Sequence, residues 1–386
     1  MVKTKSKARK GAVAKAPKPA PSGSAADVPG LIDKAHVLLA QSNFDLAIKF
    51  LERALQLEPT NLEARELLGV AELEEGDGDK GREGRQHLLH LFPPHTAEPP
   101  SSPSPYLYLA QSASEPQEAL GYYSTAAAMI ENKLNGKGKG KAADPAEVEE
   151  ERRMAVTSLI AMIEIWMSDL CFEAEASNNC DALIARAVSV APNDPEVLLT
   201  LASIRLSQSK FDEAKATILQ VYSDLEGRDP FDPMLPGLPV RLTFARLLLE
   251  HHLHLEALDI LSTVREEDSL EVEGAYLEGW AYHLRGEAVE ADPTLLAAAS
   301  NDDNDEDKPL TVAENYAESM RALLEAAKLF TEQEYPDEGI GAHIQELLKG
   351  LEARGVQPAV NEEAEDDAAD EGGWEDVEGD GDVEMA

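Results

Sequence analysis

Small residues recur along this chain at a spacing of 34 residues, and this period constrains the fold more than any other feature of the sequence. Three pairs of positions show the spacing: Ala35 and Gly69, Cys180 and Ala214, and Ala245 and Gly279. A period of 20 to 50 residues is typical of folds in which each repeat is one supersecondary unit. Alanine, leucine and glutamate dominate the composition, which favours helices over strands. We therefore expect a stack of helical units.

The stretch FDLAIKFLERALQLEPTN, residues 44–61, shows the pattern within one unit. Ala47, Leu51 and Ala54 follow one another at spacings of four and three, which places them on one face of a helix. Alanines on this face allow a second helix to approach closely. Pro59 ends the pattern because proline has no N–H and disfavours a helical conformation at the preceding residue. We predict that residues 44–57 form the second helix of a helix–turn–helix unit.

The pattern of a small residue, then Ala-x3-aliphatic-x2-Ala and a terminal proline, resembles the tetratricopeptide repeat. The resemblance covers residues 28–335 and about seven units. It implies an all-α fold, a right-handed superhelical solenoid of about seven helical hairpins. The amphipathic stretch 337–355 is expected to be a C-terminal capping helix. One such hairpin cannot bury its apolar face alone, so neighbouring units stabilise one another.

Two tails and three inserts flank or interrupt the expected repeat domain, residues 28–356. Residues 1–27 are rich in Lys, Ala and Pro, and residues 357–386 are strongly acidic, so both are expected to be disordered. The inserts have too little apolar surface to fold alone and lie near residues 93–105, 135–145 and 290–309.

The net charge of −40 limits the partners of this chain. Residues 1–20 carry seven Lys or Arg and residues 361–386 carry thirteen acids, which leaves −34 on residues 21–360. Nucleic-acid affinity comes largely from Lys and Arg, so an acidic body is unsuited to direct nucleic-acid binding. It is equally unsuited to anionic membranes, and no apolar segment of membrane-spanning length is present. The expected partner is a basic protein. No apolar segment follows the basic N-terminus, so we expect no secretory signal.

No pattern in the sequence indicates an enzyme, a metal site or a cofactor. Cys171 and Cys180 are too few for a disulfide framework and are interpreted as packed thiols in a reducing compartment. GDGDKG, residues 76–81, matches a dinucleotide-binding pattern, but a helix precedes it, so it is interpreted as a turn between helices. The His87–His90 pair and the cluster at 251–254 lack further ligands and are interpreted as helix surface.

The first helix of each unit lines the concave surface in the tetratricopeptide family. Carried over to this chain, the family's groove positions give a predicted partner-binding set: Glu63, Glu66, Glu74, Asp169, Phe172, Glu173, Leu242, Glu250, Glu273, Tyr276 and Trp280. Arg246 departs from the acidic trend. Carboxylates with aromatic rings suit a peptide rich in Arg and Lys. The alternative is that these acids only solvate exposed helix faces.

One subclass of tetratricopeptide proteins holds acidic chaperone C-termini with Lys and Asn in the groove. Here the corresponding positions are Ile32, His36, Glu66 and Val70, so this carboxylate clamp is absent.

The overall layout is similar to the fungal family of dedicated assembly chaperones of large-subunit ribosomal protein four. Three segments carry the resemblance: FDLAIKFLERALQLEPTNLEARELLGVAELEEGD, PYLYLAQ and EGGWEDVEGDGDVEMA. It implies binding of a basic ribosomal protein with a Lys/Arg-rich extended loop, and shielding of that loop in cytoplasm and nucleus. It also raises a nuclear import receptor as a further partner, and KTKSKARK is either an import signal or a solubilising arm. Two alternatives stay open: a scaffold or adaptor in chromatin or protein-degradation machinery, and an enzyme with an unrecognised site.

Overall fold

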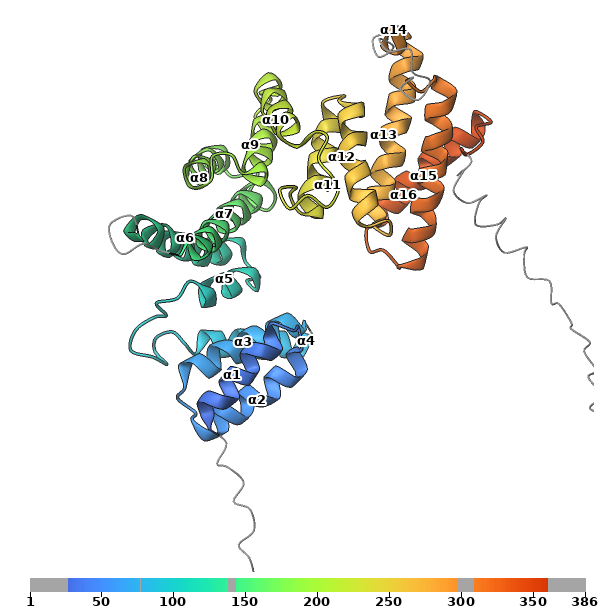
Figure 1. The fold of residues 1–386 in the computed structure, drawn as a ribbon. Helices are drawn as coiled ribbons and strands as arrows, with labels where there is room; N and C mark the ends of the chain where they lie inside the picture. The colour runs from blue at the N-terminus through green and yellow to red at the C-terminus, as the bar shows by residue number, and fades with distance from the viewer. Residues whose placement is uncertain (1–26, 77, 138–143, 298–308, 360–386) are drawn as a thin grey trace, which may run out of the picture. The chain divides into compact units, whose positions relative to one another are not determined.

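The chain is all-α over the part that the structure, a computed structural model, describes: residues 27–76, 78–137, 144–297 and 309–359. Every regular element in these ranges is a helix (Figure 1), which confirms the predicted all-α helical-repeat fold. The chain divides into two compact units, Met1–Ile165 and Trp166–Ala386, which are described separately. The two tails predicted to be disordered lie almost entirely outside the described residues.

Unit 1 consists of hairpins built from successive helices. Its helices are α1 (Val28–Leu39), α2 (Phe44–Leu57), α3 (Leu62–Glu75), α4 (Gly78–Leu89), α5 (Ser104–Gln111), α6 (Pro116–Lys137) and most of α7 (Pro145–Met167). Helix α1 packs on α2, α3 on α4, and α5 on α6. The first helices also touch along the unit, α1 with α3 and α3 with α5. Contact between first helices is what stacked helical hairpins require.

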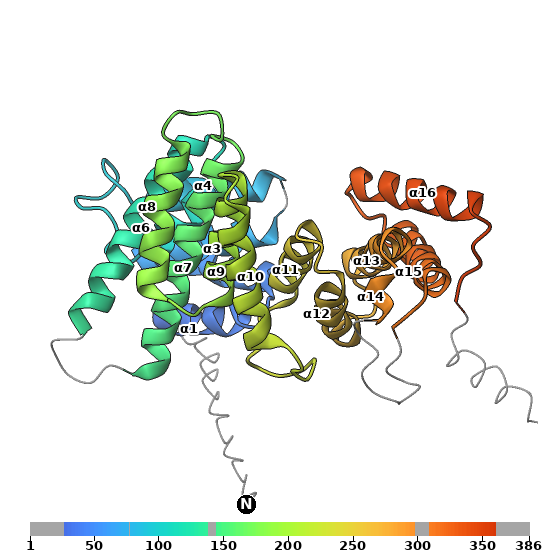
Figure 2. The same ribbon diagram turned by 90° about the horizontal axis from the view of Figure 1, so that it is seen from above.

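Unit 2 repeats this arrangement. Its helices are α8 (Ala176–Val190), α9 (Pro195–Ser207), α10 (Phe211–Leu225), α11 (Leu238–Glu250), α12 (His254–Glu267), α13 (Val272–Ala291), α14 (Thr294–Ala297), α15 (Val312–Glu332) and α16 (Glu338–Ala353). Three hairpins follow in order, α9 with α10, α11 with α12, and α13 with α15 (Figure 2). Helix α16 packs on α15 and α13, as expected of a capping helix.

The alanines that mark the repeat are fully buried. They include Ala35, Ala47, Ala54, Ala202, Ala214, Ala245 and Ala257. Helix α2 ends at Leu57, and Glu58 before Pro59 has left the helical conformation, with φ −129° and ψ 83°. The predicted helix over residues 44–57 is therefore confirmed, and so is the reason why it ends before Pro59.

The turns within several hairpins share one backbone conformation. Ser42, Ser209 and His252 each adopt positive φ, between 53° and 59°, two or three residues after the end of the first helix. The next residue then donates its N–H to a carbonyl five residues back, as from Lys210 to Arg205 at 2.8 Å. This bond satisfies an otherwise unpaired carbonyl at the helix C-terminus. Gly76, in the GDGDKG stretch, has φ 73° and ends α3, but residues 78–81 already belong to α4, so the interpretation of the whole stretch as a turn is wrong beyond its first residues.

The inserts and one cysteine differ in part from expectation. The insert near residue 290 begins later, because α13 continues to Ala291, and α14 occupies residues 294–297. The connection between α4 and α5, which contains the proline-rich insert, is irregular. Cys180 is buried on α8, but Cys171 is exposed in the turn after α7, so its interpretation as a packed thiol is wrong. Helix α7 ends at Met167, before Cys171 can enter the core.

Candidate functional site

Three predicted carboxylates lie on one side of α3 in unit 1. Asn61 begins this helix, its side chain accepting from the Ala64 N–H at 2.9 Å. Glu63 and Glu66 are three residues apart, and Glu74 follows eight residues later, so the three follow one helical stripe. The buried residues Ala64, Leu68 and Ala71 occupy the opposite side. The amphipathic pattern of α3 therefore turns these carboxylates away from the core.

The neighbours of these carboxylates come from the adjacent first helices. The Glu63 carboxylate lies 3.6 Å from His36 Nε2 on α1. Ser104 and Tyr108, both on α5, lie close to the Glu66 and Glu74 carboxylates respectively. Burial raises the pKa of Glu66 and of Tyr108, so this surface is partly shielded from water. We call it the α1/α3/α5 face, defined by His36, Glu63, Glu66, Glu74, Ser104 and Tyr108.

The α1/α3/α5 face has no internal cation to balance its acids. Among the described residues, no Lys or Arg forms an ion pair with Glu63, Glu66 or Glu74. Elsewhere in unit 1 such pairs are formed, for example between Arg85 and Glu118 at 2.7 Å. The face therefore carries an uncompensated negative potential that attracts cationic groups.

The predicted acids of unit 2 behave differently. Glu273 on α13 is only 8% exposed and forms an ion pair with Arg246 on α11. This pair joins two neighbouring first helices and neutralises the carboxylate. Glu250, at the end of α11, is exposed and has no Lys or Arg partner in the described part of the chain. Glu250 is thus available to a partner, whereas Glu273 stabilises the fold.

The aromatic side chains of α13 form a cluster with the capping helix. Tyr276 and Trp280 are stacked, with ring centroids 6.0 Å apart and an interplanar angle of 15°. His343 on α16 lies 2.8 Å from the Tyr276 hydroxyl through its Nδ1, and its ring meets Trp280 edge-on at 5.4 Å. Tyr276 is buried and Trp280 partly so. Trp280 is therefore more open to a cationic ligand than Tyr276. We call Arg246, Glu273, Tyr276, Trp280 and His343 the α11/α13/α16 face.

Four predicted residues lie elsewhere than expected: Leu242, Asp169, Phe172 and Glu173. Leu242 is buried in the core of unit 2, so it is unavailable to a partner in this conformation. Asp169, Phe172 and Glu173 were assigned to a first helix, and this placement is wrong: they lie after the end of α7, in the turn before α8. That turn spans residues 168–175, whereas the α9–α10 turn spans only 208–210. A fixed repeat length therefore overshoots the end of α7. Phe172 is 99% exposed.

Sequence reasoning missed three residues that shape these faces, Ser104, Tyr108 and His343, and it missed the ion pair of a fourth, Arg246. Ser104 and Tyr108 come from α5, whose place in the repeat is obscured by the insert before it. Arg246 was noted as an exception, but nothing local showed its pairing with Glu273, 27 residues away. His343 contacts Tyr276 across 67 residues and follows no local pattern.

Within the described residues, no group of three or more His, Cys, Asp or Glu side chains is arranged to hold a metal ion. In the same part of the chain, none of the helices has the length and apolar character to cross a membrane.

The stacked hairpins and their first-helix faces define a tetratricopeptide-repeat protein, and residues 38–93 match the tetratricopeptide repeat family. A probable assembly chaperone of rpl4 from Emericella nidulans is 30% identical over 376 residues, which cover 92% of this chain and 90% of the relative. One from Schizosaccharomyces pombe is 31% identical over 264 residues, 68% of this chain and 72% of that protein. A solved structure of an assembly chaperone of RpL4 (Acl4), residues 1–338, superimposes with a TM-score of 0.62 at 27% identity. It covers 69% of this chain and 99% of that one. The chain belongs to the family of assembly chaperones of rpl4.

Proposed function

We propose that this chain is a dedicated chaperone that binds newly made ribosomal protein rpl4 and shields its basic extension until assembly. The observation that carries the proposal is the similarity to a probable assembly chaperone of rpl4 along 92% of the chain. The similarity includes both helical units, so the proposal concerns the chain as a whole.

The charge distribution supports a basic client. Residues 21–360 carry a net charge of −34, and the α1/α3/α5 face contributes carboxylates without Lys or Arg partners among the described residues. A basic, extended segment loses conformational entropy when it binds, and charge pairing offsets part of that cost. The same pairing keeps the segment away from RNA and other polyanions.

The proposal includes escort to the nuclear pre-ribosome. Its physical support is the acidic body, which competes with RNA for the client's Lys and Arg side chains until a stronger site is reached. An import receptor would be a second partner. A fluorescently tagged chain that enters the nucleus together with rpl4, and whose loss leaves new rpl4 in cytoplasmic aggregates, would support this step.

Co-expression tests the proposed function. The tagged full chain is purified with untagged rpl4 and, in parallel, with a second ribosomal protein of similar positive charge. We expect rpl4 to be recovered in stoichiometric amount and the control protein only in traces. Equal recovery of both proteins would show that the chain binds basic proteins non-specifically, as any polyanion does. Recovery of neither would reject the proposed function. Capture of a neutral protein from chromatin or degradation machinery in place of rpl4 would favour an adaptor.

A further inference from the structure

A cavity of about 480 Å³ opens beside the α1/α3/α5 face, between α3 and the proline-rich connection from α4 to α5. Its walls come from only two stretches of chain. Leu62 and Glu66 on α3 line it together with Leu91 and residues 96–102 of the connection. Both stretches belong to unit 1, so the cavity is complete within one compact unit.

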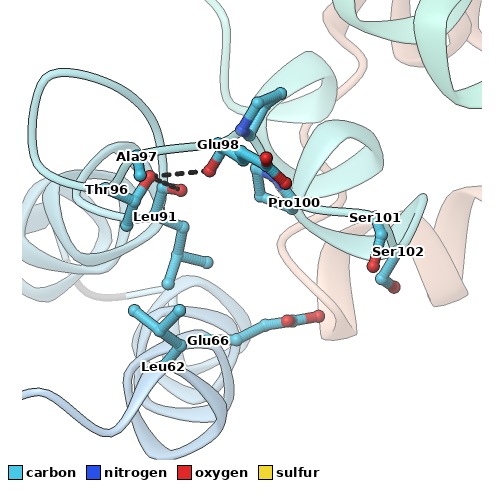
Figure 3. A pocket seen from close by; sticks show the side chains of 10 residues that line it. Leu62, Glu66, Leu91, Thr96, Ala97, Glu98, Pro100, Ser101 and Ser102 are labelled. Atoms are coloured by element: carbon cyan, nitrogen blue, oxygen red, sulfur yellow. Dashed lines mark hydrogen bonds between the residues drawn. The ribbon is translucent and has the colours of Figure 1, made fainter.

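The cavity has one apolar end and one polar end. In Figure 3, Leu62 and Leu91 face each other at one end, and the Glu66 carboxylate lies toward Ser101 and Ser102 at the other. Glu66 and Glu98 are its only charged lining residues. A ligand that fits both ends therefore combines an apolar stem with a polar or cationic head.

The proline-rich connection is held in place by its own hydrogen bonds. The Thr96 hydroxyl contacts the carbonyl oxygens of Leu91 and Glu98, each at 2.8 Å (Figure 3). The Tyr106 hydroxyl donates to the Pro100 carbonyl at 3.3 Å, which ties the connection to α5. Three prolines between residues 99 and 103 further restrict the backbone. The cavity is thus a formed feature of the fold.

We propose that this cavity binds a single Lys or Arg side chain of the extended basic segment, with the stem against Leu62 and Leu91 and the cation at Glu66 and Glu98. The inference rests on the proposed function, because it assigns one anchor point to that client. Lys and Arg side chains pack their methylene stems on apolar surface while the charged head stays polar. No Lys or Arg of the described chain pairs with Glu66 or Glu98, so the cation is supplied from outside.

The other chemistries fit less well. An anion would meet two carboxylates, and Glu63 nearby adds a third negative charge. A purely apolar side chain would bury the Glu66 carboxylate further, and burial already raises the pKa of this group. A cation in the cavity offsets the free-energy cost of burying the Glu66 carboxylate, and it lowers the pKa of Glu66 again.

Methyl NMR of the full-length chain tests the cavity without relying on rpl4. The probes are N-acetyl-arginine amide and N-acetyl-lysine amide, with N-acetyl-citrulline amide as the uncharged match of arginine. We expect saturable shifts of the Leu62 and Leu91 methyl signals with the cationic probes, and binding weaker by about tenfold with citrulline. Glu66→Gln should weaken the cationic probes by a similar factor, and Glu52→Gln, on exposed α2 surface, should leave them unchanged. Absent shifts, or equal binding of citrulline, would overturn the proposal.

Measuring the affinity of the same variants for rpl4 separates this inference from the proposed function. In the same variants, rpl4 affinity should fall for Glu66→Gln and for Glu98→Gln but not for Glu52→Gln. If the wild-type chain binds rpl4 and neither cavity variant changes the affinity, the cavity assignment fails and the function stands. If cationic probes shift the Leu62 and Leu91 signals but rpl4 does not bind, the function fails and the cavity remains a site for basic side chains.

Discussion

Gly84 on α4 lies directly against the backbone of Gly69 on α3. A Cβ atom on Gly84 would meet the Gly69 carbonyl oxygen at 2.6 Å and the Leu73 backbone nitrogen at 3.0 Å. The two helices can therefore approach this closely only without side chains at these positions. Since α3 carries Glu63, Glu66 and Glu74, the position of the α1/α3/α5 face depends on this contact.

Gly84→Ala should destabilise unit 1 by about 1–3 kcal/mol, because the added methyl group forces α3 and α4 apart. Gly81 is the matched control, since it lies on the same helix and a Cβ there meets nothing within 4 Å. Gly81→Ala should stabilise α4 by about 0.5–1 kcal/mol through helix propensity. Hydrogen–deuterium exchange of α3 and α4 peptides measures both. Equal protection in the two variants would show that the contact is not tight.

Ser209→Gly should stabilise unit 2 by about 0.5–1 kcal/mol. Ser209 adopts φ 59° in the α9–α10 turn, a conformation that costs an L-residue more than glycine. Ser203→Gly, inside α9, should instead cost about 0.5 kcal/mol. Urea unfolding followed by tryptophan fluorescence reports both changes, since Trp166 and Trp280 belong to unit 2. Destabilisation by Ser209→Gly would contradict the assigned turn conformation.

The repeat positions predicted from sequence were reliable where a hairpin has short turns. Ala47, Leu51 and Ala54 lie in the core as their spacing predicted, because a helix of fixed pitch places them on one face. The prediction failed at Asp169 and Phe172, where the turn before α8 is longer and the fixed period no longer applies. Turn length depends on local backbone conformation, which the apolar pattern does not encode.

For the candidate site, the sequence predicts which helix and which helix face carry the residues, but it does not predict their contacts. Glu66 and Glu74 follow from helical spacing, but their contacts with Ser104 and Tyr108 depend on an irregular connection. Ion pairs were not predictable from the sequence either. Glu250 and Glu273 are both glutamates on first helices, yet only Glu273 is buried and paired with Arg246. A single sequence does not specify which acid meets a distant cation.

Glu250→Lys and Glu273→Lys should therefore have different effects. The first changes an exposed side chain, so its effect on stability should stay within about 0.5 kcal/mol while rpl4 affinity falls. The second places a cation beside Arg246 and should cost about 1–3 kcal/mol, allowing for the partial exposure of Arg246. Urea unfolding and rpl4 titration separate the two. Equal stability of both variants would show that the ion pair contributes nothing.

Glu72 should make unit 1 less stable at alkaline pH. It is 4% exposed, and burial, with Glu83 and Glu52 nearby, raises the pKa of Glu72 to about 7 from 4.5. A raised pKa means that the folded state binds the proton more tightly. This contribution is complete below pH 4.5 and is lost as pH rises through 7.

Glu72→Gln should remove this pH dependence. Relative to wild type it should gain about 1–3 kcal/mol between pH 5 and pH 8.5. Exchange protection of α3 peptides at the two pH values measures the difference. Glu115→Gln, exposed before α6 and not among the groups that shift the pKa of Glu72, serves as the control. A pH-independent difference between Glu72→Gln and wild type would show that Glu72 is ionised throughout.

The affinity of the full-length chain for rpl4, measured as a function of salt, tests whether the carboxylates of the first-helix faces hold the basic segment. If carboxylates of the first-helix faces hold a basic segment, the dissociation constant should rise steeply between low and physiological salt, because exposed charge pairs are screened. Glu66→Gln and Glu250→Lys should each make that dependence shallower. A dissociation constant that does not change with salt, in wild type and variants alike, would show that these carboxylates do not hold the client.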